Sequence, residues 1–298
     1  MKTRLVHFLT GVLAAGALAF TGSANAQNGN CCNNDCCDFD GSVYAELLIW
    51  DTCQDLRYAT SGSTTNLFLD SDWDLGFRVG AMVAASDDWD LGVDFTYFNS
   101  SAKASSTASV TSVLASTALT DYSIRTELDY MILDALVSRK CCVCEKMVLR
   151  PYGGFRAFWT KQDIRETGDD GVNDHTSTAD YDMDAYGLMA GVEFEWCAFG
   201  PLTLVLKSET SLLNGSLDAT TNLDQEGANT TETSKSDCRA VFGPTNSVGL
   251  DYEDSMCDWE YGIRLSYEIS NWIHVDNPLD DNNDLGVHGF NVQFRVQF

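Results

Sequence analysis

The chain has few basic residues: 18 Lys and Arg stand against 44 Asp and Glu, which gives a formal net charge of −26. This balance argues against nucleic acid as a partner, because phosphate backbones attract the opposite charge. Proline is also scarce, with four residues against 23 glycines, and no change in composition marks a linker. Long uninterrupted strands tolerate this composition well, so we expect a sheet protein of one large domain or two smaller ones.

Long apolar runs are absent after the first 26 residues, since none approaches the ~20 residues that a transmembrane helix needs. The first 26 residues themselves are typical of an export signal. Lys2 and Arg4 form a basic start, Leu5 to Phe20 is largely apolar, and Ala24-Asn25-Ala26 fits a small-x-small cleavage site. The chain is therefore expected to be exported, and a closed barrel is the one remaining way for it to span a membrane.

Catalytic motifs are absent as well. Beyond the signal the only histidines are His175, His274 and His288, and neither Gly-x-Ser-x-Gly nor His-Glu-x-x-His occurs. A barrel enzyme would have to bring Ser and His together near one rim, which leaves His274 open, although solvated polar residues are the simpler interpretation. The acidic stretch 276–284 starts like an EF-hand loop but has Leu285 at position six and no closing glutamate. We expect no enzyme activity, no cofactor and no metal site.

The strongest signal present is the C-terminal stretch 290–298, in which every second residue is apolar. This is the period of a β-strand with one face in an apolar medium. Asn291, Gln293, Arg295 and Gln297 form a polar face that suits a barrel lumen, and the other face could contact lipid. A closing strand that ends in an aromatic, Phe298, resembles the assembly signal of bacterial outer-membrane barrels.

Similar alternation divides the chain into about ten strands, with roughly 8 to 12 compatible, and predicts an all-β, closed antiparallel transmembrane barrel. A soluble β-sandwich would alternate in the same way. The uninterrupted apolar face, with aromatics near the segment ends, favours the barrel. The phase falters near Asp134, which suggests a bulge. The expected strands are 43–50, 75–84, 89–98, 122–137, 149–159, 186–196, 202–207, 259–266, 272–275 and 290–298.

The expected connections alternate between short and long, as in a barrel with both ends in the periplasm. Those expected to be short are 86–88, 138–146, 197–201 and roughly 268–271. Those expected to be long, polar and external are 51–74, 99–121, 161–181, 214–255 and 276–286.

Three repeated motifs indicate a family. Asp72-Trp-Asp-Leu-Gly-Phe-Arg-Val-Gly80, Asp88-Trp-Asp-Leu-Gly-Val93 and Asp258-Trp-Glu-Tyr-Gly-Ile-Arg264 resemble strands of the Legionella-type major outer-membrane protein family. Stretches 128–134 and 151–156 are similar to two further family strands. The resemblance implies a pore-forming outer-membrane barrel. The abundance of cysteine is closer to the branch in Chlamydia-like bacteria, whose outer-membrane proteins are disulfide-crosslinked.

The predicted function is a porin or channel for small solutes that is also a disulfide-crosslinked envelope scaffold. The alternative is a non-conducting structural or adhesive barrel with exposed acidic loops, because barrels of ~8 strands are filled by their own side chains and those of ~16 leave a channel. The residues expected to line the lumen are Arg78, Asp94, Arg150, Arg156, Glu193, Glu195, Lys207, Glu209, Glu260, Arg264 and Arg295.

Eleven cysteines are expected to form disulfides, since an oxidising compartment favours them and the spacing misses the common zinc patterns. An odd number leaves at least one thiol free or paired with another molecule. A periplasmic arm would hold Cys31, Cys32, Cys36 and Cys37; periplasmic turns would hold Cys141, Cys142, Cys144 and Cys197; external loops, or residues beside them, would include Cys53, Cys238 and Cys257.

The sequence thus predicts a signal peptide over 1–26, a cysteine-rich periplasmic arm over 27–42 and an outer-membrane barrel over 43–298. The expected partners are outer-membrane lipid, the barrel assembly machinery that would recognise Phe298, and disulfide-linked copies or other envelope proteins.

Overall fold

The computed structural model describes residues 41–53, 57–61, 65–69, 72–86, 89–112, 114, 117–144, 146–199, 202–225, 228–256, 259–275 and 284–298. The expected signal peptide, nearly all of the expected periplasmic arm and most of the acidic stretch 276–284 lie outside these residues. Within them, no helix is long and apolar enough to cross a membrane.

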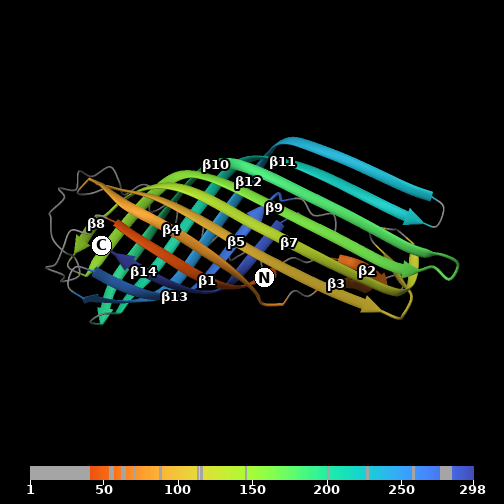
Figure 1. Ribbon diagram of the computed structural model, residues 1–298, viewed down its shortest axis with the longest axis horizontal. Coiled ribbons are helices and arrows are strands. Elements are labelled where there is room, and N and C mark those ends of the chain that lie inside the picture. Colours follow the sequence, from red (N-terminus) through yellow and green to blue (C-terminus); the bar gives the residue numbers. More distant parts are fainter. Residues whose placement is uncertain are drawn as a thin grey trace.

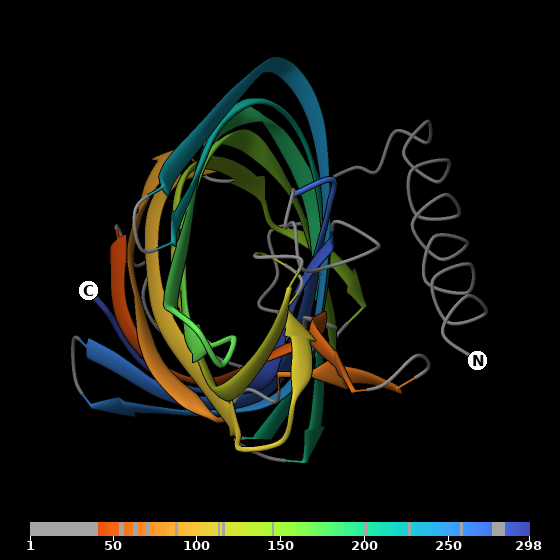
Figure 2. The ribbon, with the colours of Figure 1, turned by 90° about the vertical axis from the view of Figure 1, so that its right-hand side faces the viewer.

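Ten long antiparallel strands close into a barrel (Figures 1 and 2). Each pairs with the next one along the chain, and pairing of β1 with β14 closes the ring. The predicted fold class and strand number are therefore confirmed. The ten strands are β1 (Gly41–Cys53), β4 (Asp74–Ser86), β5 (Trp89–Ser106), β7 (Ala118–Arg139), β9 (Met147–Asp169), β10 (Asp174–Phe199), β11 (Leu202–Gln225), β12 (Ala228–Met256), β13 (Trp259–Ile273) and β14 (Asp284–Gln297).

Four short strands extend the sheet at its two ends. At the end that holds the longer connections, β2 (Arg57–Ser61), β3 (Thr65–Phe68) and β6 (Val110–Ser112) join the edge of β7. At the end that holds Phe298, β8 (Cys141–Cys144) continues β7 along β9. Phe298 is fixed there by two main-chain hydrogen bonds with Gly41, of 3.1 and 3.0 Å.

An apolar belt surrounds the barrel near the Phe298 end. Its members alternate with inward-facing residues and are exposed to the surroundings, as illustrated by Leu188 (71% exposed) and Phe294 (52%). In β10 the exposed aromatics Tyr186 and Trp196 mark the two borders of the belt, ten residues apart. A tilted transmembrane strand needs about 9–11 residues, so the belt is tall enough to cross a bilayer once.

Strands β9 to β12 continue far past the belt, and Figure 1 shows them as a long extension of the barrel wall. They contain 23, 26, 24 and 29 residues. The predictions of long loops over 161–181 and 214–255 are therefore wrong, because only residues 170–173 separate β9 from β10 and only residues 226–227 separate β11 from β12. Their outer halves carry Thr, Ser, Asn and Asp on both faces, so they lack the apolar alternation by which a strand is recognised.

Two further boundaries differ from the prediction. The stretch 272–275 is no separate strand, and 268–271 is no turn, because both belong largely to β13. The tenth place in the barrel is taken by β12, whose outward apolar alternation is limited to Val248, Leu250 and Tyr252. The predicted bulge at Asp134 is also wrong. The register runs unbroken there, and the shift in β7 lies between Thr120 and Ser123.

The barrel has an oval cross-section when viewed along its long axis (Figure 2). Inward-facing side chains of its outer half form one buried hydrophobic cluster, so opposite walls share a core. Members from six different strands include Trp50, Phe98, Ile124, Ile164, Met183 and Leu213.

Candidate functional site

The barrel interior is the candidate functional site, and aromatic side chains cross it near the outer border of the belt. Trp272 on β13 donates a hydrogen bond from Nε1 to the Tyr130 hydroxyl on β7, 3.0 Å away. These two strands are five places apart in either direction around the ring. The bond therefore spans the interior from one wall to the opposite one.

Three more rings complete this aromatic layer, which we define as Trp50, Phe98, Tyr130, Phe158 and Trp272. Phe158 stacks on Trp272 with 4.3 Å between ring centroids, and Trp50 lies 5.5 Å from Phe98 and 6.1 Å from Tyr130. None of the five is more than 1% exposed. A side chain at Gly243 on β12 would place its Cβ 2.4 Å from the Trp272 ring, so that glycine makes room for the layer.

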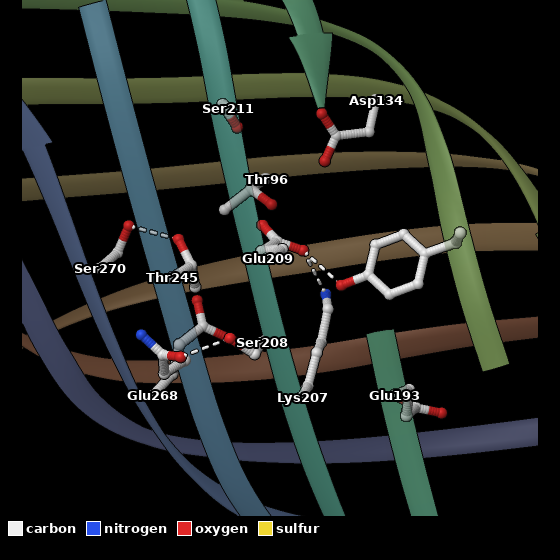
Figure 3. Close-up of polar contacts among 12 residues, drawn as sticks. Thr96, Asp134, Glu193, Lys207, Ser208, Glu209, Ser211, Thr245, Glu268 and Ser270 are labelled. Atoms are coloured by element: carbon white, nitrogen blue, oxygen red, sulfur yellow. Dashed lines mark hydrogen bonds and ion pairs between the residues drawn. The ribbon is translucent and has the colours of Figure 1, made fainter. Parts of the chain in front are cut away.

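Charged side chains fill the interior between the aromatic layer and the Phe298 end. Arg156 on β9 binds Asp134 on β7 at 2.6 Å and Glu209 on β11 at 2.8 Å. Glu209 also accepts from Lys207 at 3.0 Å and from the Tyr152 hydroxyl at 2.8 Å. Figure 3 shows Glu209 facing Lys207, with Asp134 and Ser211 close by.

A second arginine, Arg78 on β4, links further walls. It binds Glu46 on β1 and Glu268 on β13, each at 2.9 Å. Since β1 and β14 separate β4 from β13, the contact to Glu268 is made through the interior. Arg78 also lies 5.6 Å from the centroid of the Trp50 ring, and Arg156 lies 5.9 Å from that of Trp272. The charged and aromatic layers are therefore in direct contact.

The third group of ion pairs lies closest to the Phe298 end. Arg264 on β13 binds Glu193 at 3.0 Å and Asp251 at 2.9 Å, with Glu195 at 3.9 Å. Arg295 on β14 shares Asp251 at 3.2 Å and also contacts Glu253. Alternate strands are bridged here, because β13 lies between β14 and β12.

The structure places all eleven predicted lumen residues on the inward face, and eight of them are in the ion pairs above. Asp94 is hydrogen-bonded to Tyr44. Glu260 is buried, and Lys140 is a cation that interacts electrostatically with it. Arg150 lies beside Glu193 and Glu195 without an ion pair among the described residues, and its Nε has no hydrogen-bond partner there.

Sequence reasoning predicted Glu193, Glu195 and Glu209 but missed the whole aromatic layer and five further acidic partners of these cations, which are Glu46, Asp134, Asp251, Glu253 and Glu268. The same alternation that assigned Arg156 to the interior also assigns Asp134, Phe158 and Glu268 there. What it does not supply is the strand order across the ring. Contacts such as Trp272 with Tyr130 join residues 142 positions apart.

Two described cysteines, Cys142 and Cys197, are disulfide-bonded. Cys141, Cys144 and Cys238 are free thiols, and Cys53 is exposed at the end of β1. Cys238 lies in β12 at an irregularity of the register, with φ of 63°, rather than in or beside an external loop. Cys31, Cys32, Cys36, Cys37 and Cys257 lie outside the described residues. No group of three or more metal-binding side chains occurs in the described part of the chain.

The side chains of the three histidines contact groups other than serine hydroxyls. His175 binds Asp170 at 2.8 Å near the β9–β10 turn, His288 contacts the Tyr267 hydroxyl at 2.9 Å, and His274 lies 3.3 Å from the main-chain oxygen of Ala240. The structure thus supplies no Ser-His pair within its described residues.

Residues 42–298 match the family model described as Legionella pneumophila major outer membrane protein precursor. The chain belongs to this family. The resemblance stated above is therefore confirmed. The predicted location of the protein, the bacterial outer membrane, is confirmed as well. The apolar belt is therefore its lipid-facing surface. No curated protein shows significant similarity to the chain.

Several solved outer-membrane barrels are similar in structure to this family member. The outer membrane protease OmpT from Escherichia coli has a TM-score of 0.48 at 10% identity, covering 88% of this chain and 98% of its own. The P. putida toluene transporter TodX has a TM-score of 0.42 at 9% identity, covering 91% and 94%. OprG from Pseudomonas aeruginosa has a TM-score of 0.36 at 10% identity, covering 86% and 96%. At these identities no function passes from those proteins to this one.

Proposed function

We propose that this outer-membrane protein is a structural barrel whose membrane-level interior is closed to solutes, and that it holds a strand-built, acidic extension outside the lipid. The observation that carries the proposal is the hydrogen bond and ring stacking of Trp272 with residues of the opposite wall. A water-filled channel would leave the inward faces of these side chains accessible, whereas the five aromatic rings are 0–1% exposed.

The charged layer supports the same function. Buried charges are stable only when they are paired and hydrogen-bonded. Arg156 and Glu209 are 4% and 3% exposed and satisfy each other at 2.8 Å. A ten-stranded barrel lies nearer in size to the ~8-stranded barrels filled by their side chains than to the ~16-stranded barrels with a channel. This proposed role requires no catalysis.

A porin remains the second candidate, because part of the charged layer is either partly exposed or without an ion pair within the described part of the chain. Lys207 is 29% exposed and Arg150 has no ion pair among the described residues. Such groups could contact ions if the aromatic layer moved aside. The two candidates differ in one property, which is solute flux through the folded wild-type barrel.

Liposome swelling in small sugars tests the proposal. Wild-type protein should give no swelling above empty liposomes. The variant with Phe158→Ala and Trp272→Ala should admit sugars, because it removes two stacked rings from the layer. The matched control is Phe155→Ala with Leu265→Ala, which shortens two lipid-facing side chains on the same strands and should stay closed. Swelling by folded wild-type protein would reject the closed barrel in favour of the porin.

We also propose that cysteines at the Phe298 end crosslink the barrel to other envelope proteins. Cys141 and Cys144 are free thiols beside the disulfide-bonded Cys142, and Lys140 is next to them in sequence. Thiol-blocked envelopes run without reductant should show high-mass species that collapse to monomer on reduction. The variant with Cys141→Ser and Cys144→Ser should lose part of them, and Cys238→Ser on the outer extension is the control. Only monomer in unreduced wild-type samples would exclude crosslinking.

A further inference from the structure

Three cations stand side by side on the outer wall of the extension. Lys103 on β5 is directly opposite Arg125 on β7, and Arg125 is directly opposite Arg165 on β9. All three are exposed and occupy the same outward phase as the lipid-facing residues Val93, Leu133 and Phe155. We call these three residues the cation row. In a chain with net charge −26, such a concentration of positive charge calls for an explanation.

By itself, the cation row destabilises the sheet. Directly opposite residues have Cβ atoms about 4.5–5.5 Å apart, and like charges in that arrangement destabilise a sheet. An ion pair between Arg125 and Glu127 on the same strand reduces the repulsion at Arg125. Lys103 and Arg165 have no ion pair among the described residues. A polyvalent anion bound across all three would remove the repulsion.

The surroundings of the cation row suit phosphate on the side away from the membrane. On the membrane side lies a row of carboxylates, Glu127, Asp163 and Asp180, in register on adjacent strands, and Asp163 is paired with Lys161. On the far side the next outward positions carry the hydroxyls of Ser105, Ser123 and Thr167. Guanidinium groups form strong charge-assisted hydrogen bonds with phosphate oxygens, and hydroxyl groups can donate to the same oxygens.

The height of the cation row above the bilayer distinguishes between two positions of phosphate, at the lipid border and further out. Trp159 and Tyr186 are hydrogen-bonded at 3.1 Å and mark the outer border of the belt. Arg165 lies six residues beyond Trp159, which is about 20 Å along a strand and, at a tilt of about 45°, about 14 Å along the membrane normal. The glycerol or glucosamine phosphates of a lipid lie at the border itself. Phosphates on a saccharide attached to the lipid lie further out.

We propose that the cation row binds phosphate groups on the saccharide of an outer-leaflet glycolipid. Each guanidinium would form charge-assisted hydrogen bonds with phosphate oxygens, and the carboxylate row keeps the contact away from the lipid border. The proposal is independent of whether the barrel conducts.

Calorimetric titration of the folded, detergent-solubilised protein tests it. The probe is a phosphorylated core oligosaccharide released from lipopolysaccharide, and the comparison ligands are its phosphatase-treated form, inorganic phosphate and lipid A in nanodiscs. The phosphorylated saccharide should bind, more weakly at higher salt. Arg125→Gln with Arg165→Gln should weaken binding by about tenfold or more, since charged hydrogen bonds are lost. Lys235→Gln with Arg239→Gln, on β12 of the same extension, should leave it unchanged.

Arg125→Lys with Arg165→Lys keeps the charge and should retain most of the binding even if the glutamine variant folds poorly. Equal binding by the two glutamine variants would overturn the proposal. So would binding of the phosphatase-treated saccharide as strong as that of the phosphorylated one, or binding of lipid A alone. The last result would place the phosphate site at the lipid border. Binding of inorganic phosphate as tight as that of the saccharide would likewise exclude saccharide recognition.

Discussion

At the scale of single residues, Arg156 joins three strands of the interior. Replacing it with alanine leaves Asp134 buried without a counter-charge and leaves Glu209 with Lys207 alone, and breaking a buried ion pair costs about 3–5 kcal/mol in other proteins. We expect Arg156→Ala to lower the free energy of unfolding by about that amount, measured by urea unfolding from lipid vesicles.

The matched control for Arg156 is Arg125→Ala. Arg125 and Glu127 also form an ion pair, but their side chains are 53% and 44% exposed. Exposed pairs contribute about 0–1 kcal/mol, so this variant should unfold almost like wild type. Equal destabilisation by the two variants would contradict the assignment of Arg156 to a closed interior.

Asp170 in the β9–β10 turn should make that turn sensitive to acid. Hydrogen bonds from His175 and from the main-chain N–H groups of Asn173 and Val172 lower the pKa of its carboxyl from 3.8 to about 2. A lowered pKa in the folded state means that the ionised group stabilises the turn above pH 3.8, and that this contribution is lost as the pH falls towards 2. Asp170→Asn should remove it at every pH.

Hydrogen exchange of the 170–175 amides, measured at pH 5 and pH 2.5, checks this expectation. Wild-type protein should lose protection between the two values after correction for the intrinsic rate. Asp170→Asn should show the lower protection at both. A wild-type turn equally protected at both pH values would refute the role of Asp170.

At the scale of elements, closure of the barrel depends on β14. It pairs with β1 over twelve residue positions and with β13 over fourteen, so its loss would expose two sheet edges. Deleting Phe298, or changing it to Asp, should block assembly and lower the amount of protein in the outer membrane. Normal outer-membrane levels of the deletion variant would argue against Phe298 as an assembly signal. Val292→Ala, on the lipid-facing side of the same strand, is the control.

The orientation of the extension is tested by epitope tags. A tag inserted beside Val172, which is 82% exposed at the β9–β10 turn, should be detected by antibody on intact cells. A tag beside Lys146, at the Phe298 end, should be detected only after the outer membrane is permeabilised. The opposite pattern of detection would show that the barrel has the reverse orientation in the membrane.

At the scale of the whole molecule, the sequence predicts the barrel well where lipid contacts one face. Phe290, Phe294 and Leu188 alternate with polar residues because one side of each strand must be apolar. The prediction fails where both faces of a strand are polar, as in the outer half of β12. The predicted number of ten strands is correct only because the stretch 272–275 was counted as a strand and β12 was not. Interior contacts such as Arg78 with Glu268 depend on strand order around the ring, which alternation does not encode.

The closed interior is tested most directly by the conductance of purified wild-type protein in planar bilayers, with folding verified beforehand by its heat-dependent mobility in gels. We predict no discrete channels across ±150 mV, a range of about 3.5 kcal/mol per elementary charge on each side, and discrete openings for the variant with Phe158→Ala and Trp272→Ala. Stable, discrete channels from folded wild-type protein would contradict the account.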